Sequence, residues 1–236
     1  MRRLTIVIPA LDEAPIIAGA LTALQPLRQR GAEIIVADSG SRDGTPALAA
    51  PLADRVVAAP RGRGAAMNAG AAAGTGNSLV FLHADTMLPE NADALIAAAL
   101  AQRAWGRFDI RIGGHHPFLA VVARMVNLRS WLTGVATGDQ AIFVTRAAFA
   151  AVGGFPDLPL MEDVALSHRL KRLGRPYCIG THAVTSGRRW EHHGVIRTIV
   201  LMWRLRLAYY LGVEPARLAR AYGPVPPSAA ERGAGP

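Results

Sequence analysis

Apolar runs and helical patterns alternate along the first half of the chain. Short, mostly apolar runs predict buried strands at residues 4–8, 33–37, 55–58 and 79–82. Helical patterns separate these runs, over residues 14–30, from Thr45-Pro46 onward, and in the alanine-rich part of residues 61–74. Alternating strands and helices imply right-handed crossovers, so the pattern predicts an α/β fold with a mostly parallel sheet.

The second half has a less regular pattern. Helices are expected at residues 91–104 and 162–173, the second ending before Gly174, and strands at residues 106–112 and 141–144. An apolar stretch over residues 116–136 contains two arginines. Residues 223–236 are rich in Pro, Ala and Gly and predict a disordered tail. We therefore expect one domain over residues 1–222.

Residues 195–211 are apolar enough to suggest a membrane span. They contain Arg197, Arg204 and Arg206, and each arginine costs about 2.5–3.5 kcal/mol at a membrane centre. At 100° per residue, Arg204 and Arg206 lie about 200° apart, so the arginines do not form one polar stripe. A helix packed on the body, on a second subunit or on a membrane surface therefore fits better than a span.

The composition is that of a globular protein, with 51% hydrophobic and 18% charged residues. The net charge of +9 suits anionic partners: phosphates, nucleic acid or an acidic membrane surface. We expect no nucleic-acid partner, because no basic run is interleaved with aromatic residues. A single cysteine, Cys178, excludes an internal disulfide and fits a cytoplasmic protein, with association to a membrane left open.

Asp85 follows the apolar run of residues 79–82, at the end of a predicted strand. Open α/β sheets bind ligands at the carboxyl ends of their strands, and a carboxylate there can hold a divalent cation that binds phosphates. The alternative is structural, since an Asp past a strand also makes turns and caps helices. Neighbouring motifs must decide between the two.

Other acids and arginines occur in short motifs on both sides of Asp85. Pro9 and Glu13 follow the first strand, and Asp38 ends the second, in the run ADSGSRDGT. Arg61 and Arg63 lie in the run RGRGAAMNAG. The last motifs are Gly138-Asp139-Gln140, Gly153-Gly154-Phe155, the pair Glu162-Asp163, and the run RRWE that includes Arg189 and Trp190.

With these motifs in this order, residues 4–190 resemble the family 2 glycosyltransferases, inverting enzymes of the GT-A fold. Within that family the runs FLHADT and RRWE are similar to a bacterial branch associated with arsenosugar biosynthesis. The resemblance implies a nucleotide-sugar-binding half at residues 1–112 and an acceptor half with C-terminal helices at residues 113–222. It also implies an unidentified hydroxyl acceptor. The apolar pattern of residues 195–211 itself leaves open a peripheral membrane contact or a homodimer.

The resemblance also implies roles on the donor side. Pro9 and Glu13 would line the nucleotide pocket, Asp38 would bind the base, and Arg61 and Arg63 would contact the pyrophosphate. Ser39 stands where family members often have a second acid.

The remaining roles concern metal and acceptor. Asp85 matches the last acid of the family's metal-binding motif, which implies Mg²⁺ or Mn²⁺, whereas His83 stands at the motif's first position. Asp163, beside Glu162, matches the catalytic base that deprotonates the acceptor hydroxyl. The acceptor side would be built by the residues Gly138, Asp139, Gln140, Arg189 and Trp190.

Simpler readings of these residues stay open. Asp38 could only form a turn, Glu162 and Asp163 could only favour the start of their helix, and Trp190 could be a core aromatic. At the level of the whole chain, the alternatives are a sugar nucleotidyltransferase and a non-catalytic nucleotide-binding module. The run after the first strand lacks the Gly-rich loop with Arg and Lys that a nucleotidyltransferase uses.

Overall fold

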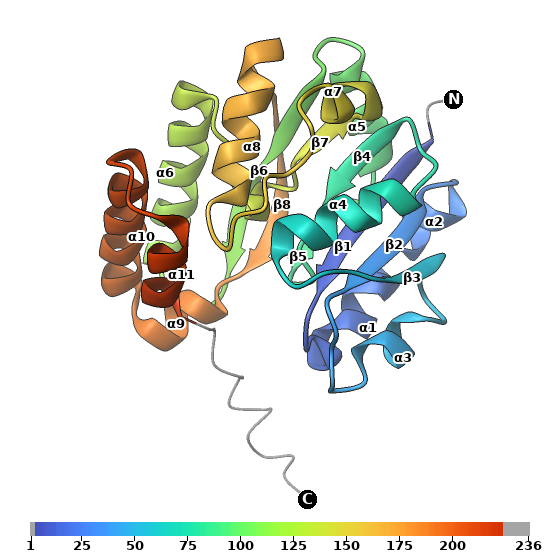
Figure 1. The fold of residues 1–236 in the computed structure, drawn as a ribbon, viewed down its shortest axis with the longest axis horizontal. Coiled ribbons are helices and arrows are strands. Elements are labelled where there is room, and N and C mark those ends of the chain that lie inside the picture. Colours follow the sequence, from blue (N-terminus) through green and yellow to red (C-terminus); the bar gives the residue numbers. More distant parts are fainter. Residues whose placement is uncertain (1–2, 224–236) are drawn as a thin grey trace, which may run out of the picture.

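In a computed structural model that describes residues 3–223, eight strands form one mixed sheet (Figure 1). The strand order is β3-β2-β1-β4-β7-β6-β8-β5. The pairs β1–β2, β1–β4, β2–β3 and β6–β8 are parallel, whereas β7 and β5 run antiparallel to their neighbours. The strands are β1 (Leu4–Ala10), β2 (Glu33–Asp38), β3 (Arg55–Ala58), β4 (Ser78–Phe81), β5 (Thr86–Met87), β6 (Trp105–Gly113), β7 (Phe143–Thr145) and β8 (Tyr177–Ser186).

Helices cover both faces of this sheet, as the first-half pattern predicts (Figure 1). The α-helices are α1 (Ala14–Ala23), α2 (Gln25–Gln29), α3 (Thr45–Ala49), α4 (Arg63–Ala73), α5 (Ala92–Leu100), α6 (Phe118–Thr133), α7 (Arg146–Ala151), α8 (Glu162–Leu170), α9 (Arg188–His193), α10 (Val195–Tyr210) and α11 (Pro215–Tyr222). Two short 3₁₀ turns are η1 (Gly138–Gln140) and η2 (Lys171–Leu173).

The apolar core lies in two layers because successive residues of each strand point to opposite faces. Ile6 and Ile8 of β1 pack with α1, α2, α3 and α5 on one face. Val7, between them, packs with α4, α7 and α8 on the other. On that second face Phe81 meets Phe155 edge-on, with ring centroids 4.7 Å apart. The two layers fix the strand ends, which carry the polar loops described below.

Several predicted elements differ in detail. The single helix expected over residues 14–30 is two helices, α1 and α2, with the break next to Pro26, which has no amide hydrogen to donate within a helix. The ten-residue strand β8 was not predicted from the pattern, because its buried residues do not alternate regularly and Gly180 interrupts it. The helix expected at 162–173 becomes the turn η2 in its last three residues.

Helices α6, α9, α10 and α11 form a separate layer beyond β6 and β8, seen at the left of Figure 1. Apolar side chains of α6 and α10 pack with Ile110 and Ile112 of β6. Within residues 3–223 no helix is long and apolar enough to cross a membrane, in line with the expectation for residues 195–211. In the tail predicted to be disordered, residues 224–236 lie outside the described part of the chain.

Candidate active site

The loops after β1 and β2 are joined by hydrogen bonds between their backbone and side chains. The amide of Asp12 donates to Ser41 Oγ at 2.9 Å, and the amide of Arg42 donates back to Asp12 Oδ1 at 2.8 Å. One residue further, the amide of Glu13 donates to Thr45 Oγ1 at 2.8 Å. These bonds fix the loop that carries Glu13 at the carboxyl end of the parallel strands, where open α/β sheets bind ligands.

Asp38 is buried and forms a turn at the end of β2. Its Oδ2 accepts hydrogen bonds from the amides of Gly40 and Ser41, at 3.0 and 3.1 Å. Its Oδ1 accepts one from the hydroxyl of Ser41. The turn-forming role is therefore present in the structure, and the base-binding role of Asp38 stays a prediction.

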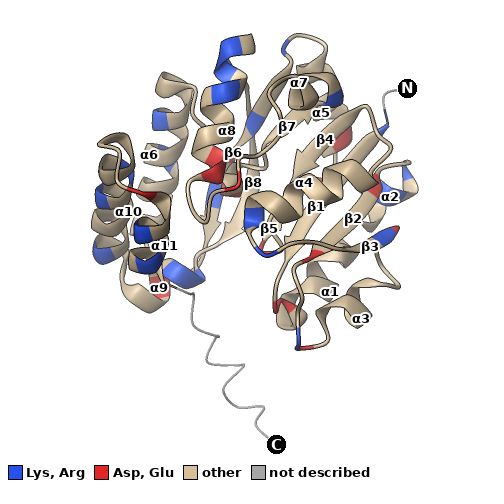
Figure 2. Ribbon diagram, viewed as in Figure 1, with Lys and Arg blue, Asp and Glu red and all other residues tan. Residues whose placement is uncertain are grey.

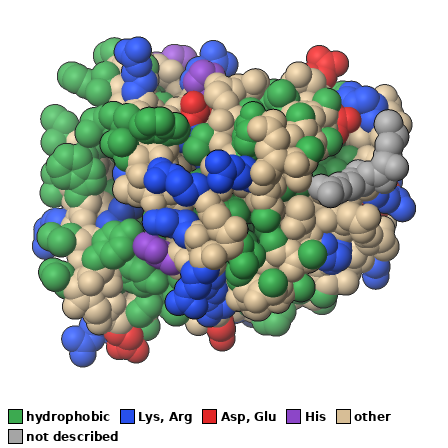
Figure 3. All heavy atoms as spheres, turned by 90° about the horizontal axis from the view of Figure 1, so that it is seen from above, with side chains coloured by type: hydrophobic (Ala, Val, Ile, Leu, Met, Phe, Trp, Pro, Cys, Tyr) green, Lys and Arg blue, Asp and Glu red, His purple; other side chains and the backbone are tan. Residues whose placement is uncertain are grey.

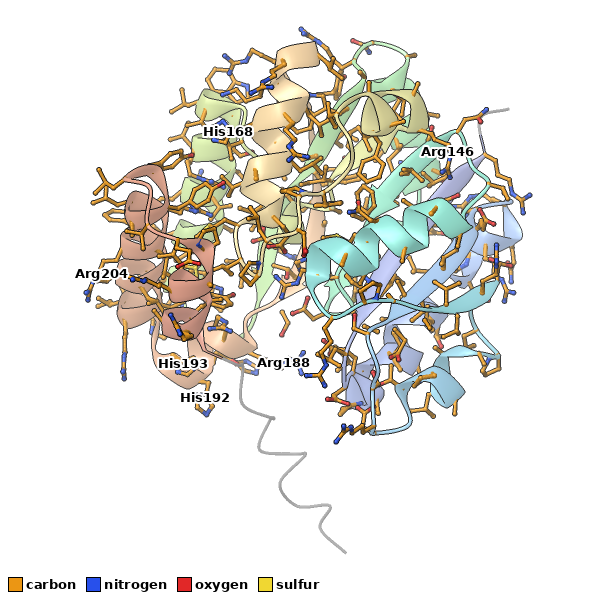
Figure 4. The ribbon with its side chains drawn as sticks, in the orientation of Figure 1. Arg146, His168, Arg188, His192, His193 and Arg204 are labelled. Carbon is orange, nitrogen blue, oxygen red and sulfur yellow. The ribbon has the colours of Figure 1, made fainter. Side chains whose placement is uncertain are left out.

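Glu13 and Asp85 are neighbouring acids contributed by two different strand ends. Burial is the main cause that raises the pKa of Glu13 to about 7, and the negative charge of Asp85 adds to it. The charges of Arg188 and Arg63 act in the opposite direction. In Figure 4, Arg188 extends from α9 on the side that faces the N-terminal half. The two carboxyls therefore lie in one region, and Arg63 of α4 and Arg188 of α9 contribute positive charge to it.

Arg63, at the start of α4, pairs with Glu162, at the start of α8. Arg63 Nη1 lies 3.6 Å from Glu162 Oε1, and the Glu162 side chain is only 4% exposed. Figure 2 shows this basic start of α4 facing the acidic start of α8. Residue 64 is a glycine that allows this approach: a Cβ there would lie 2.9 Å from the carbonyl oxygen of Pro156, in the loop before α8, and 3.4 Å from the Cβ of Glu162.

Asp163 contacts the 3₁₀ turn η1. The amide of Gly138 donates to Asp163 Oδ2 at 2.8 Å, and the amide of Val164 donates to Oδ1 at 2.7 Å. In the same turn Asp139 is half-buried, and its Oδ1 atom is buried without a hydrogen-bond partner. Burial is the main cause that raises the pKa of Asp139, and the charge of Asp163 adds to it. The predicted base and two predicted acceptor-side residues are therefore in one place.

His83 packs against the same turn. A Cβ on Gly138 would lie 2.4 Å from His83 Nε2, so the imidazole rests on the glycine backbone. The Nε2 atom is buried without a hydrogen-bond partner. Burial, helped by the charge of Arg63, lowers the pKa of His83 to about 3, and the ring is therefore neutral at physiological pH. This contact links the loop of Asp85 to the turn that binds Asp163.

Arg129 of α6 and Arg206 of α10 lie near this acidic group. Burial is the main cause that lowers the pKa of Arg129 to about 10, and Arg206 lowers it further, while Asp139 raises it. The Nε and Nη2 atoms of Arg129 are buried without hydrogen-bond partners. Sequence reasoning noticed both arginines inside apolar stretches but assigned no site to them; a charged residue in an apolar helix was the available signal.

Arg189 contacts the last described residues of the chain rather than the turn η1. Its Nη1 and Nη2 atoms donate to the carbonyl oxygens of Tyr222 and Gly223, each at 3.2 Å. Its guanidinium also lies 3.8 Å from the centre of the Tyr222 ring. Trp190 is half-buried and packs against the apolar cluster of β6 and α6, which is the core role that the sequence left open.

The other predicted residues have simpler surroundings. Pro9 is half-buried within β1, where it pairs with Ala37 of β2. Arg61 is exposed, and the Gln140 side chain is buried and accepts the amide of Thr137 at 3.1 Å. His192 and His193, at the lower end of the molecule in Figure 4, have ring centroids 4.8 Å apart. The structure thus gathers Glu13, Arg63, Asp85, Gly138, Asp139, Glu162 and Asp163. Sequence reasoning named His83 and Arg188 within motifs but did not foresee their surroundings, and it assigned no site role to Arg129 or Arg206.

A divalent cation fits this site only if other groups share its coordination. Residues 3–223 contain no group of three or more His, Cys, Asp or Glu side chains placed to hold a metal. Asp85 offers a partly exposed carboxylate, and hard cations prefer oxygen ligands. Mg²⁺ commonly uses one or two carboxylates, with phosphates and water as its other ligands. Asp85 therefore fits a cation that a diphosphate also binds.

Comparison with known families gives a match in the first half of the chain. Residues 5–117, just under half of the chain, match the model described as "Glycosyl transferase family 2". This part of the chain is similar to glycosyl transferase family 2. A comparison with curated proteins gives no significant match. The narrower resemblance to the arsenosugar branch stays a prediction.

Solved structures similar to the chain include several glycosyltransferases. A mannosyltransferase from Pyrobaculum calidifontis, in complex with GDP-Man and Mn²⁺, has a TM-score of 0.63 and 24% identity over 96% of this chain and 66% of its own. The glucosyl-3-phosphoglycerate synthase of Mycobacterium tuberculosis, with Mn²⁺, UDP and phosphoglyceric acid, has a TM-score of 0.62 and 22% identity over 90% and 79%. S. aureus TarS 1-349 has a TM-score of 0.62 and 15% identity over 84% and 64%. The chain spans about two thirds of the first and last of these, and the predicted GT-A fold is confirmed.

Proposed function

We propose that the protein transfers a hexose from a nucleotide-sugar donor to a hydroxyl acceptor with inversion, and that Asp163 is the base. The observation that carries the proposal is the position of Asp163. Its carboxylate is held by the amide of Gly138, next to the pair of Glu162 and Arg63. The family 2 match and the two similar structures solved with a nucleotide or nucleotide-sugar and Mn²⁺ support this reading.

The chemistry requires a carboxylate that is ionised and within reach of the acceptor. An inverting transfer forms the new bond while a base takes the proton from the attacking hydroxyl. Asp163 accepts one amide hydrogen bond on each oxygen, which orients the carboxylate and leaves lone pairs for a hydroxyl. We assign this role to Asp163 rather than to Glu162, because Glu162 is buried and pairs with Arg63.

Positive groups in the donor pocket would stabilise the departing diphosphate. Arg63 is about half exposed, and we propose that it contacts the donor pyrophosphate together with Arg61. When bound, Mg²⁺ or Mn²⁺ held by Asp85 would neutralise part of the charge that grows on the leaving group. Glu13, Pro9 and Asp38 would line the nucleotide pocket, as the family resemblance implies.

Nucleoside diphosphate release tests the proposal. The donors are UDP-glucose and GDP-mannose with Mn²⁺, and the acceptors are water and a panel of small hydroxyl compounds. We expect Asp163→Asn to lower the rate by about 10²- to 10⁴-fold, the range for loss of a general base, with donor affinity by calorimetry unchanged. The control Glu90→Gln removes an exposed carboxyl and should keep the rate. Full activity of Asp163→Asn would disprove the assignment.

The same assay separates the alternatives. We expect Asp85→Ala to abolish the part of donor binding that depends on Mn²⁺. Donor binding by the wild type without turnover of any donor would favour a non-catalytic nucleotide-binding module. Formation of a nucleotide-sugar from a nucleoside triphosphate and a sugar phosphate would favour a nucleotidyltransferase.

A further inference from the structure

Helices α6 and α10 each expose a continuous apolar stripe. On α6 the stripe consists of Phe118, Val121, Met125, Leu128 and Leu132, which are 49–57% exposed. On α10 and the residue that follows it, the stripe consists of Ile196, Val200, Trp203, Leu207, Tyr210 and Leu211, which are 48–75% exposed. Within each stripe the residues are mainly three or four positions apart, so they lie on one face of the helix. Single exposed apolar residues are common on soluble proteins. Two apolar stripes on adjacent helices form a larger patch, and such patches mark sites that bind a partner or a membrane.

These stripes are additional to the faces that hold the helices on the body. On α6, Leu119, Val122 and Ala123 are buried against β6 and α10. On α10, Leu205 is buried against Val135 and Val164. The buried faces therefore hold both helices on the body, and the exposed stripes are not needed for this packing. Figure 3 shows hydrophobic side chains gathered at the end of the molecule formed by this helical layer.

The charges of the two helices indicate the chemistry of the occupant. Residues 118–133 and 195–210 contain five arginines and no acidic residue. Arg124, Arg197 and Arg204 are exposed, and Figure 4 shows Arg204 pointing outward from the edge of α10. At 100° per residue, Arg197 and Arg204 lie on the same side of the α10 stripe, close to its border. The surface therefore has an apolar centre with a cationic border.

We propose that this face, called here the α6–α10 surface, docks on an anionic lipid bilayer. Amphipathic helices that lie in a bilayer interface bury an apolar stripe among the acyl chains, and flanking Lys or Arg bind acidic headgroups. Trp131, Trp203 and Tyr210 belong to the exposed residues of the two helices, and Trp and Tyr favour the level of the headgroups. The α6–α10 surface has the apolar stripes, the flanking arginines and the exposed Trp and Tyr side chains.

Charge argues against a second copy of the chain as the occupant. A symmetric dimer through the α6–α10 surface would bring together the arginines of both copies, and neither copy has an acid on these helices to pair with them. Like charges facing each other oppose association, whereas anionic lipids attract the same arginines. The bilayer is therefore the occupant that both the apolar and the charged residues favour.

Vesicle co-sedimentation tests this proposal without donor or acceptor, so its outcome does not depend on the proposed function. The probes are vesicles of phosphatidylcholine alone and of phosphatidylcholine with 30% phosphatidylglycerol, a fraction of about one lipid in three chosen to give a clearly negative surface. We expect the protein to sediment with the anionic vesicles and to lose this binding as salt rises, because salt screens the attraction. Failure to bind anionic vesicles, or equal binding to neutral ones, would overturn the proposal.

Two variants locate the binding on the α6–α10 surface. Leu128→Gln with Trp203→Gln removes apolar area, and Arg197→Gln with Arg204→Gln removes charge; both pairs are exposed, so the fold should survive. We expect each double variant to bind at least tenfold more weakly. The matched controls Leu48→Gln, on α3, and Arg55→Gln, on β3, should bind as the wild type does.

Sedimentation velocity in the absence of lipid tests whether a second copy of the chain covers the α6–α10 surface instead. We expect a monomer. A dimer that dissociates in the Leu128→Gln, Trp203→Gln variant would show that a second copy covers the surface and would overturn the proposal. Weaker vesicle binding by the two control variants, to the same extent as by the test variants, would overturn it as well.

Discussion

At the scale of single residues, the adjacent carboxyls of Glu162 and Asp163 have different surroundings. Glu162 is buried, and this burial, with the charge of Asp163, raises its pKa to about 7, although Arg63 acts against the rise. Asp163 is half-buried and accepts two backbone amides. Glu162 therefore pairs with Arg63 of α4, and Asp163 contacts the turn η1.

This difference predicts how stability depends on pH. Between the ordinary pKa of 4.5 and about 7, the folded protein keeps a proton on Glu162 that the unfolded chain has lost. The contribution of this carboxyl to the free energy of unfolding therefore falls as pH rises through that window, by on the order of 3 kcal/mol. Glu162→Gln cannot ionise, so denaturant unfolding should show the variant gaining stability relative to the wild type from pH 4.5 to 7.

A control variant isolates the effect of burial in that experiment. Glu90→Gln also removes one carboxyl, but from an exposed position. Its stability relative to the wild type should change much less over the same pH range. Parallel curves for Glu162→Gln and the wild type would contradict the raised pKa of Glu162.

Sequence reasoning reached these acids because an acid after an apolar run, or before a helical pattern, is visible in the chain itself. Asp85 was found in this way, whereas the role of Asp163 came from the family resemblance. The hydrogen bond from Gly138 to Asp163 joins residues 25 positions apart, and the contact of His83 with Gly138 joins residues from two different loops. Neither contact has a local pattern, so only the folded structure could show them.

At the scale of elements, the 3₁₀ turn η1 brings the two halves of the site together. Its first residue, Gly138, donates to Asp163 and supports the ring of His83. Its last residue, Gln140, accepts the amide of Thr137 and so closes the turn. Sequence analysis placed this turn on the acceptor side from the family resemblance, and its geometry could not be derived from residue spacing.

Gly138→Ala tests the importance of this turn. The new Cβ would lie 2.4 Å from His83 Nε2, so the ring or the turn must move. Overpacking of this kind costs about 1–3 kcal/mol, and thermal or denaturant unfolding should show the loss. If the proposed function holds, displacement of the turn also lowers the transfer rate. Gly180→Ala, where a Cβ meets no atom within 4 Å, is the control and should change little.

At the scale of the whole molecule, one sheet connects the segment that matches the family 2 model to the helical layer at the other end. The strands β1 to β4 and their helices were predicted from the sequence, because short apolar runs alternate there with helical patterns. Of these strands β1, β2 and β4 are buried, and β3 is exposed to half-buried. The strand β8 and the position of the C-terminal helices were not predicted, since they depend on contacts between distant parts of the chain. Helix α11 lies next to α9, because Arg189 of α9 donates to the carbonyl oxygens of Tyr222 and Gly223 and stacks on the Tyr222 ring.

Tyr222→Ala measures how much the contact between α11 and α9 contributes to the free energy of unfolding. The variant loses the stacking of Arg189 on the ring and the packing of a half-buried aromatic, but keeps the backbone carbonyls that accept from Arg189. We expect the free energy of unfolding to fall by about 1–2 kcal/mol, since a cation–π contact contributes about 0.5–2 kcal/mol. Tyr222→Phe keeps the ring and should stay close to the wild type. Equal losses in the two variants would show that the hydroxyl, not the ring, matters.

The contact between His83 and Gly138 also restricts how this sequence can evolve. The imidazole occupies the space that any side chain at position 138 would need. A shorter aspartate at position 83 would vacate that space, and the glycine at position 138 would no longer be required for steric reasons. Substitutions at the two positions should therefore be correlated among descendants of this chain, and an ancestor with an acid at position 83 was free to carry a larger residue at position 138.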